Sequence, residues 1–265
     1  MPTNENSELR TYYEWSGQDH GEVLLLGNSL GSNLHMWDKV LPGLERSHRI
    51  LRYDTRGHGK SSVPPAPYTL DQLGRDVLFL LDSLGVRRVD YCGLSLGGMV
   101  GMWLGLHAPH RVRRMVLANT AARIGTREMW NERIENIRNS GMGPIADATP
   151  ARWFTLSYRE SHAEEMEAIR EMVAATDPVG YSGCCGVLRD TDLRNDLAAI
   201  ETPSLVITGT EDPATPPADG RALCAGLPDA RYVELNASHL SAWERADDFA
   251  KEVLAFLENE ERCDG

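Results

Sequence analysis

The chain has 265 residues, of which 42% are hydrophobic and 25% are charged, and its formal net charge is −12. Such a chain can bury a large core, and this composition is typical of a globular protein. The acidic excess argues against a nucleic-acid partner, because phosphates attract basic surfaces. No apolar run reaches the ~18 residues of a membrane span, and the first residues lack the pattern of a signal peptide. We therefore expect a soluble, cytoplasmic protein that does not contact membranes.

The cysteine pattern gives no sign of a metal or redox site. There are five cysteines, an odd number, and no two of them have Cys-x-x-Cys spacing. We therefore expect neither a metal ion nor any other cofactor. The oligomeric state is not indicated by the sequence.

In the first part of the chain, apolar β-prone runs alternate with segments of helical periodicity. This alternation predicts a mostly parallel sheet with helices on both faces. The predicted strands cover residues 9–15, 22–27, 48–54, 89–94 and 113–120, and the predicted helices cover 34–44, 69–84 and 96–108.

The alternation stops after residue 120 and resumes near residue 195. Between them we predict helices over 127–139, 144–151 and 162–175 and no strand. We predict that this insertion, residues 121–194, is a helical cap over the carboxyl ends of the strands. The predicted core is then formed by residues 1–120 and 195–265, the second part with strands over 204–208 and 230–235 and helices over 218–226 and 246–258.

One motif suggests a nucleophile. The strand from residue 89 ends in Gly93-Leu94-Ser95-Leu96-Gly97, a Gly-x-Ser-x-Gly pattern followed at once by a predicted helix. A sharp turn at this place exposes the serine hydroxyl beside a helix N-terminus, where N–H groups stabilise negative charge. Ser95 is the predicted nucleophile.

An acid and a base follow later predicted strands. Asp212 lies after the strand 204–208, and His239 lies after the strand 230–235. The carboxyl ends of parallel strands share one edge of a sheet, so all three side chains can meet there. The order serine, acid, histidine is that of the α/β-hydrolase fold. Glu211 is the alternative acid, but Asp212 is favoured because it directly precedes Pro213.

Two backbone N–H groups are the predicted oxyanion hole. Leu96 follows the nucleophile, and Leu30 belongs to the small-residue loop 28–33 after the second predicted strand. The alternative for that loop is a plain turn. His58 lies in a glycine-rich loop, and we predict a structural role for it.

Several stretches resemble 3-oxoadipate enol-lactonases, α/β-hydrolases of aromatic catabolism by the β-ketoadipate pathway. The resemblance covers nearly the whole chain, and its most specific parts are Asn119-Thr120-Ala121-Ala122-Arg123-Ile124-Gly125 and Arg152-Trp153-Phe154-Thr155. The other matching stretches are residues 28–31, 52–59, 93–98 and 232–241.

The resemblance implies a serine hydrolase that opens a small anionic lactone, with 3-oxoadipate as the product. Arg133 and Trp130 resemble the family's binding pair; the alternative for Arg133 is a surface residue on an amphipathic helix. Trp153 and Ser29 are further predicted substrate-binding residues. After His239 the chain departs from the usual family sequence at Ala242-Trp243. We predict that Trp243 reshapes the pocket.

Other functions are compatible with the same residues. One is a carboxylesterase or a lactonase for another substrate, and another is a cofactor-free perhydrolase. A different class is a binding protein that senses a ligand without turnover, although a pure sensor has no need of a complete triad.

Overall fold

The computed structural model describes residues 3–5 and 9–258, and an eight-stranded sheet forms its centre. The strands occur in the order β1-β2-β4-β3-β5-β6-β7-β8; β1 and β2 run antiparallel to their neighbours and the others are parallel. Their bounds are β1 Thr3–Glu5, β2 Arg10–Gly17, β3 Val23–Gly27, β4 Arg49–Tyr53, β5 Val89–Leu94, β6 Val112–Ala118, β7 Ser204–Gly209 and β8 Ala230–Leu235. The mostly parallel sheet predicted from the sequence is confirmed, and β1 is an additional strand.

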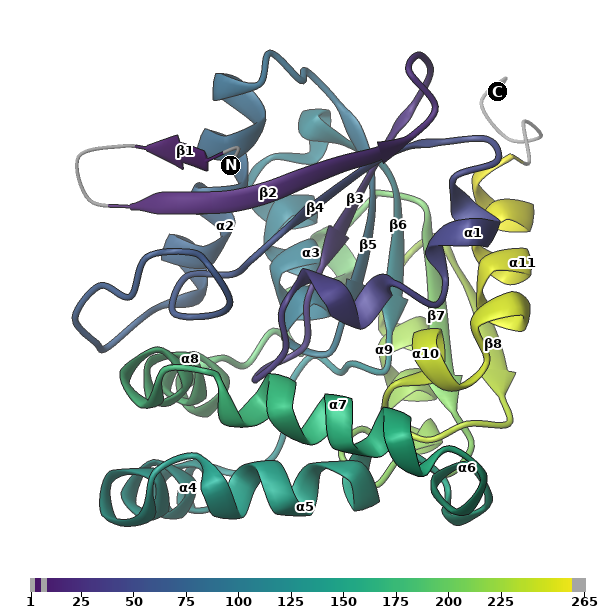
Figure 1. Cartoon of the computed structure of the whole chain (residues 1–265). Coiled ribbons are helices and arrows are strands. Elements are labelled where there is room, and N and C mark those ends of the chain that lie inside the picture. Colours follow the sequence, from purple (N-terminus) through teal and green to yellow (C-terminus); the bar gives the residue numbers. More distant parts are fainter. Residues whose placement is uncertain (1–2, 6–8, 259–265) are drawn as a thin grey trace.

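The three strands β3, β5 and β7 are buried along their whole length. Their continuous apolar sequences fit this position, since both faces of a parallel sheet are covered by helices. On one face lie α2 (Leu70–Ser83), α3 (Leu96–His107) and α9 (Pro217–Gly226); on the other lie α1 (Leu41–Leu44) and α11 (Ala246–Leu257), which pack on each other (Figure 1).

One predicted helix is wrong. The segment 34–44 contains a short 3-10 turn, Leu34–Trp37, followed after a break by the four-residue α1. Pro42 and Gly43 both disfavour a long helix, because proline lacks an N–H group and glycine loses more backbone entropy. The segment therefore forms a short 3-10 turn and a four-residue α-helix in place of one long helix.

The segment between β6 and β7 forms five α-helices. They are α4 (Arg127–Ser140), α5 (Gly143–Trp153), α6 (Leu156–Ser161), α7 (Ala163–Ala174) and α8 (Pro178–Asp190). They form a layer at the end of the sheet to which the parallel strands point (Figure 1). We keep the name cap for residues 121–194; the division into domains stays a prediction.

Two of these helices were not predicted. Three glycines interrupt the periodicity of α8, and α6 is only six residues long. Helix α8 nevertheless begins with a capping aspartate, Asp177, which accepts hydrogen bonds from Val179 and Gly180 N–H groups, and with Pro178 at its first position. Within the described residues no helix is long and apolar enough to cross a membrane.

Candidate active site

The turn between β5 and α3 holds Ser95 in a strained conformation. Its φ is +59° and its ψ is −114°, a region that residues with a Cβ atom rarely adopt. The Ser95 N–H group donates to the carbonyl oxygen of Ala118 at 2.9 Å, and the Thr120 hydroxyl donates to the Ser95 carbonyl at 2.8 Å. The neighbouring strand end therefore stabilises the strained residue from both sides.

Gly93 and Gly97 allow this turn because neither has a side chain that would clash with the neighbouring backbone. A methyl group at Gly97 would lie 2.2 Å from the carbonyl oxygen of Gly27, and one at Gly93 would lie 2.3 Å from that of Gly97. Both distances are far below van der Waals contact. The start of α3 therefore packs directly on the end of β3, and Ser95 is brought beside the loop that follows β3.

His239 and Asp212 form a buried hydrogen-bonded pair. Nδ1 of His239 lies 2.8 Å from Oδ2 of Asp212, and both side chains are almost fully buried. Burial raises the pKa of Asp212, but the charge and hydrogen bond of His239, with donors on Asn119 and Thr215, outweigh it and lower that pKa to about 2. Glu211, the alternative acid, is exposed.

Asn119 connects the acid to the histidine loop, and the sequence interpretation missed this role. Its side-chain amide donates to Oδ2 of Asp212 at 3.0 Å and to the carbonyl oxygen of Ser238 at 3.2 Å. Its carbonyl oxygen accepts from the Ser241 hydroxyl. Asn119 has φ +44°, a value for which asparagine is better suited than most residues. That preference was a possible signal in the sequence.

The predicted oxyanion N–H groups have no acceptor within the described part of the chain. Neither Leu30 nor Leu96 donates its backbone N–H to another residue. The adjoining Ser29 N–H contacts the sulfur of Met36 at 3.2 Å, a weak acceptor. Both leucine N–H groups are thus free to bind an anion.

His58 stabilises the loop that contains Leu30. Its Nε2 accepts from the Gly31 N–H at 3.0 Å, and its Nδ1 bonds to the Arg56 carbonyl at 3.1 Å. Burial lowers the pKa of His58 to about 4, so the ring is neutral near pH 7 with its proton on Nδ1. This agrees with the predicted structural role.

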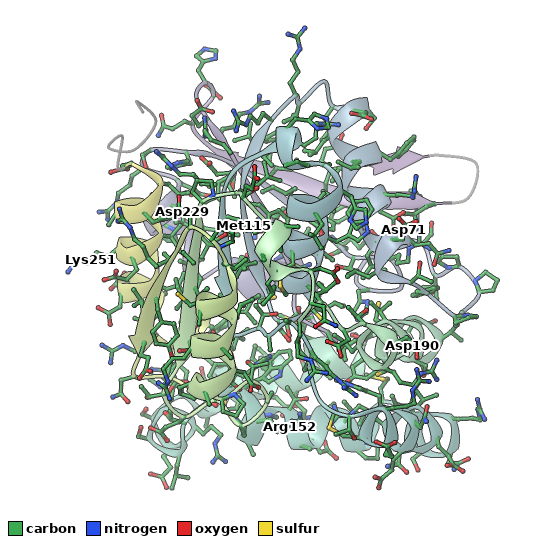
Figure 2. All side chains as sticks on the ribbon, turned by 180° about the vertical axis from the view of Figure 1, so that it is seen from behind. Asp71, Met115, Arg152, Asp190, Asp229 and Lys251 are labelled. Carbon is green, nitrogen blue, oxygen red and sulfur yellow. The ribbon has the colours of Figure 1, made fainter. Side chains whose placement is uncertain are left out.

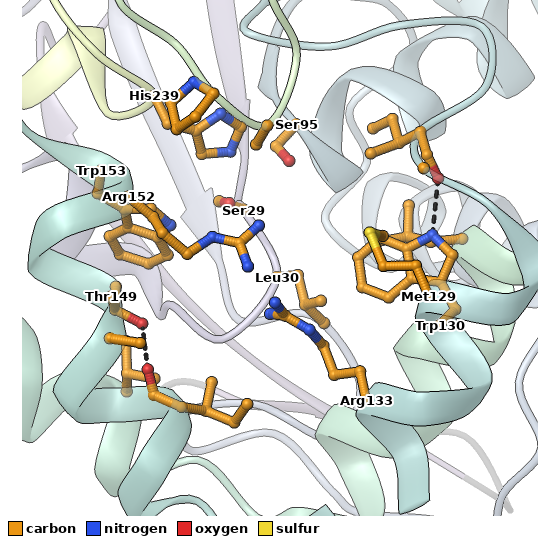
Figure 3. A pocket seen from close by; sticks show the side chains of 18 of the residues that line it. Ser29, Leu30, Ser95, Met129, Trp130, Arg133, Thr149, Arg152, Trp153 and His239 are labelled. Carbon is orange, nitrogen blue, oxygen red and sulfur yellow. Dashed lines mark hydrogen bonds between the residues drawn. The ribbon is translucent and has the colours of Figure 1, made fainter. Parts of the chain in front are cut away.

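A cavity of about 120 Å³ lies between the cap and the sheet edge. Ser95 and His239 lie at one end of it, and the side chains of Arg133 and Arg152 extend into it from two cap helices (Figure 3). Four other predicted residues also line it: Ser29, Leu30, Trp130 and Trp153. The lining is therefore largely apolar and aromatic, with two guanidinium groups facing the nucleophile.

Arg133 is held by neighbours that leave it directed into the cavity. Its guanidinium lies 5.6 Å from the centre of the Trp130 ring and donates to the Tyr181 hydroxyl at 3.1 Å. The Trp130 indole N–H itself donates to the Ile124 carbonyl at 2.7 Å, so this tryptophan offers a substrate only its ring. No carboxylate of the described residues pairs with Arg133.

Arg152 is a second cavity cation, which the sequence interpretation left out. Arg152 lies near the end of α5, among the cap helices. Figure 2 shows it apart from the central sheet, whose position is marked there by the label of Met115 on β6. Its guanidinium forms no hydrogen bond or ion pair with any described residue. Burial, and then the charge of Arg133, lowers the pKa of Arg152. The Arg152-Trp153 pair in the family-like stretch was a signal for it.

Trp243 is not brought to this cavity. Its indole N–H donates to Oε2 of Glu165 at 2.7 Å, and the Lys39 ammonium lies 5.8 Å from its ring centre. Trp243 lies on the short helix α10 (Ser241–Glu244), whose direction carries the ring toward α7. The expectation that it reshapes the pocket is therefore corrected: it contacts the cap outside the cavity.

Comparison with known proteins identifies the family. A model of the alpha/beta hydrolase fold matches residues 22–246. The chain belongs to the α/β-hydrolase family. It is 40% identical to "3-oxoadipate enol-lactonase 2" of Acinetobacter baylyi, over 92% of both chains. It matches the structure of the enol-lactonase from Burkholderia xenovorans LB400 with a TM-score of 0.95 and 44% identity, covering 97% of this chain and 100% of that one.

A second structural relative is a hydrolase from Pseudomonas aeruginosa PA01, with 46% identity, a TM-score of 0.93 and 97% of each chain covered. The predicted α/β-hydrolase fold, the resemblance to enol-lactonases and the prediction of a hydrolytic enzyme are confirmed by these matches. No group of three or more metal-ligating side chains lies together in the described part of this α/β-hydrolase.

Proposed function

We propose that this α/β-hydrolase opens a small carboxylate-bearing lactone, 3-oxoadipate enol-lactone, to 3-oxoadipate in aromatic catabolism. The observation that carries the proposal is the pair of unneutralised guanidinium groups in the cavity that Ser95 and His239 line. Partly buried cations without a carboxylate partner are costly, so an anionic substrate is the chemistry they favour. The similarity to two enol-lactonases of Acinetobacter baylyi supports the lactone.

The mechanism follows the residue types. Asp212 holds Nδ1 of His239, which leaves Nε2 to take the Ser95 proton as Oγ attacks the ring carbonyl. The N–H groups of Leu30 and Leu96 hold the oxyanion, each worth ~3 kcal/mol of transition-state stabilisation. The ring C–O bond breaks, protonated His239 gives its proton to the ring oxygen, and the resulting enol, which stays part of the acyl group on Ser95, tautomerises to a ketone. Water activated by His239 then releases the carboxylate and regenerates Ser95.

In this proposal Arg133 and Arg152 bind the substrate carboxylate. The rings of Trp130 and Trp153 form the apolar walls, and Ser29 lines the side next to the oxyanion loop. A cavity of this kind, mostly apolar with a few placed polar groups, is typical of small-molecule sites.

The decisive test follows the ultraviolet absorbance of the enol-lactone. We expect the wild type to open it much faster than nitrophenyl esters of similar size, and Ser95→Ala to lower kcat on the order of 10⁶-fold. The matched control is Ser161→Ala, because Ser161 is exposed on α6 outside the cavity. A wild type that opens the lactone no faster than generic esters contradicts the proposed substrate.

A further inference from the structure

Glu244 crosses the boundary between the core and the cap just after the catalytic histidine in the chain. Its Oε2 accepts from the Ser238 N–H at 3.0 Å. The Thr155 N–H donates to both carboxylate oxygens at 3.3 Å, and the Thr155 hydroxyl donates to Oε1. One carboxylate therefore joins the residue before His239 to the start of α6 in the cap.

The loop around His239 contacts the same cap segment twice more. The Leu240 N–H donates to the Trp153 carbonyl at 3.0 Å, and the Ser238 hydroxyl donates to the Arg152 carbonyl at 3.2 Å. The residues on either side of His239 are thus hydrogen-bonded to cap residues that include the cavity-lining Arg152. His239 and Arg152 therefore lie on two segments that are hydrogen-bonded to each other.

The Glu244 carboxylate accepts hydrogen bonds from uncharged groups. Within the described residues no arginine, lysine or histidine side chain pairs with it, and three N–H or O–H groups point at its two oxygens instead. A carboxylate only accepts hydrogen bonds, whereas a glutamine amide would turn an NH₂ group toward one of these donors. The arrangement therefore favours a glutamate over a glutamine.

We propose that Glu244 is a positioning residue that docks the His239 loop onto cap residues 152–155 and so sets the base relative to Ser95 and the substrate. This inference rests on the proposed serine-hydrolase function. The core holds the other side of the loop, because Asn119 donates to the Ser238 carbonyl. Loss of Glu244 therefore displaces the histidine without releasing it.

The experiment compares two carboxylate-to-amide changes at the same boundary. Glu244→Gln is the test, and Glu165→Gln is the matched control. Glu165 on α7 also links cap and core, since it accepts from Lys39 at 2.6 Å and from Trp243 at 2.7 Å, but it touches no residue from 238 to 240. Circular dichroism and thermal unfolding establish that both variants are folded.

The first readout is the rate at which a fluorophosphonate labels Ser95, because this needs the base but no particular substrate. We expect about tenfold slower labelling for Glu244→Gln, and kcat for a nitrophenyl ester lowered to the same degree with KM unchanged, since small displacements of reacting groups are costly. Glu165→Gln keeps both values within about twofold. Glu244→Ala is slower again, so the glutamine variant is a partial rescue.

Wild-type labelling and kcat in Glu244→Gln would overturn the inference. An equal loss in Glu165→Gln would also overturn it, because the effect would then belong to general cap docking. Thr155→Val, which removes only the hydroxyl donor, gives a further measurement if the alanine variant does not fold. A wild type that is labelled but does not open the lactone contradicts the proposed substrate and leaves the role of Glu244 testable.

Discussion

At the scale of single residues, the candidate site contains a charged group that is fully hydrogen-bonded within the protein and another that has no partner there. Asp212 accepts hydrogen bonds from His239, Asn119, Thr215 and the Ala214 N–H, so its charge is fully satisfied inside the protein. Arg152 has no such partner and extends into the cavity. The first charge orients a catalytic group, and the second is left for a ligand.

Replacing Arg152 tests that distinction. We expect Arg152→Gln to raise KM for the carboxylate-bearing lactone about tenfold or more, because a charge-assisted hydrogen bond to the substrate is lost. KM for a neutral ester stays close to the wild-type value. Arg170→Gln is the control, since that guanidinium pairs with Glu167 on the outside of α7. An equal change for neutral and anionic substrates would argue against carboxylate binding.

The depressed pKa of Asp212 predicts a pH-dependent stability. The folded-state value of about 2 lies below the unfolded value of ~3.9, so the carboxylate stabilises the fold above the unfolded pKa. This contribution, about 2–3 kcal/mol, decreases as the pH falls toward 2. Urea unfolding at several pH values should show the wild type losing most of its advantage over Asp212→Asn between about pH 5 and about pH 2. A constant difference would contradict this expectation.

At the scale of elements, the contact between α3 and β3 determines where the nucleophile lies. Gly97 permits α3 to begin against the end of β3, and its N–H donates to the Asn28 carbonyl at 2.9 Å. The same approach places Leu96 and Leu30 beside Ser95. The geometry of the oxyanion hole is therefore a consequence of helix–strand packing and not of the Gly-x-Ser-x-Gly turn alone.

Two glycine-to-alanine changes separate close packing from helix propensity. Gly97→Ala is expected to destabilise the fold by at least ~2 kcal/mol and to lower activity, because the new methyl group meets backbone atoms of β3. Gly186→Ala in α8 meets no atom within 4 Å and should stabilise by ~0.5–1 kcal/mol. Denaturant unfolding measures both. Tolerance of alanine at position 97 would refute the packing argument.

At the scale of the whole molecule, the cap is connected to the core at places far apart in the chain. Glu165 joins α7 to Lys39 and Trp243, the Thr176 hydroxyl donates to the Gly31 carbonyl at 3.1 Å, and Glu244 joins the histidine loop to α6. The proposed catalytic groups come from the core and the two cavity arginines from the cap. The active site therefore depends on how the two layers dock.

Hydrogen exchange can measure the contribution of one such connection. We expect Glu165→Gln to speed amide exchange in α7, because a carboxylate on this helix that accepts from Lys39, Trp243 and Tyr158 is lost. Exchange in α2, which lies away from the cap, should be unchanged. Unaltered exchange in α7 would show that other contacts hold this part of the cap.

The sequence was sufficient for the features that depend on local pattern. Apolar runs alternating with helical periodicity predicted the parallel sheet, and Ser95, Asp212 and His239 were predicted as catalytic residues because each follows a strand end. The helices α6 and α8 were missed, since one is short and the other has three glycines whose low helix propensity is overridden by capping and packing. The four α-helical residues of α1 show the opposite error, a periodic segment that Pro42 and Gly43 interrupt.

By itself the sequence determined the fold class and was sufficient to propose Ser95, Asp212 and His239 as nucleophile, acid and base, because strand order places those groups at one edge of a sheet. Only the tertiary structure decided which other side chains meet them. Asn119 and Glu244 bind residues far away in the chain, and Arg152 reaches the cavity from the cap. Trp243 lies close to His239 in sequence but contacts Glu165 of the cap. The physical reason is that the direction of a side chain depends on how its helix or strand packs against the others. The distance between two residues along the chain does not determine that packing.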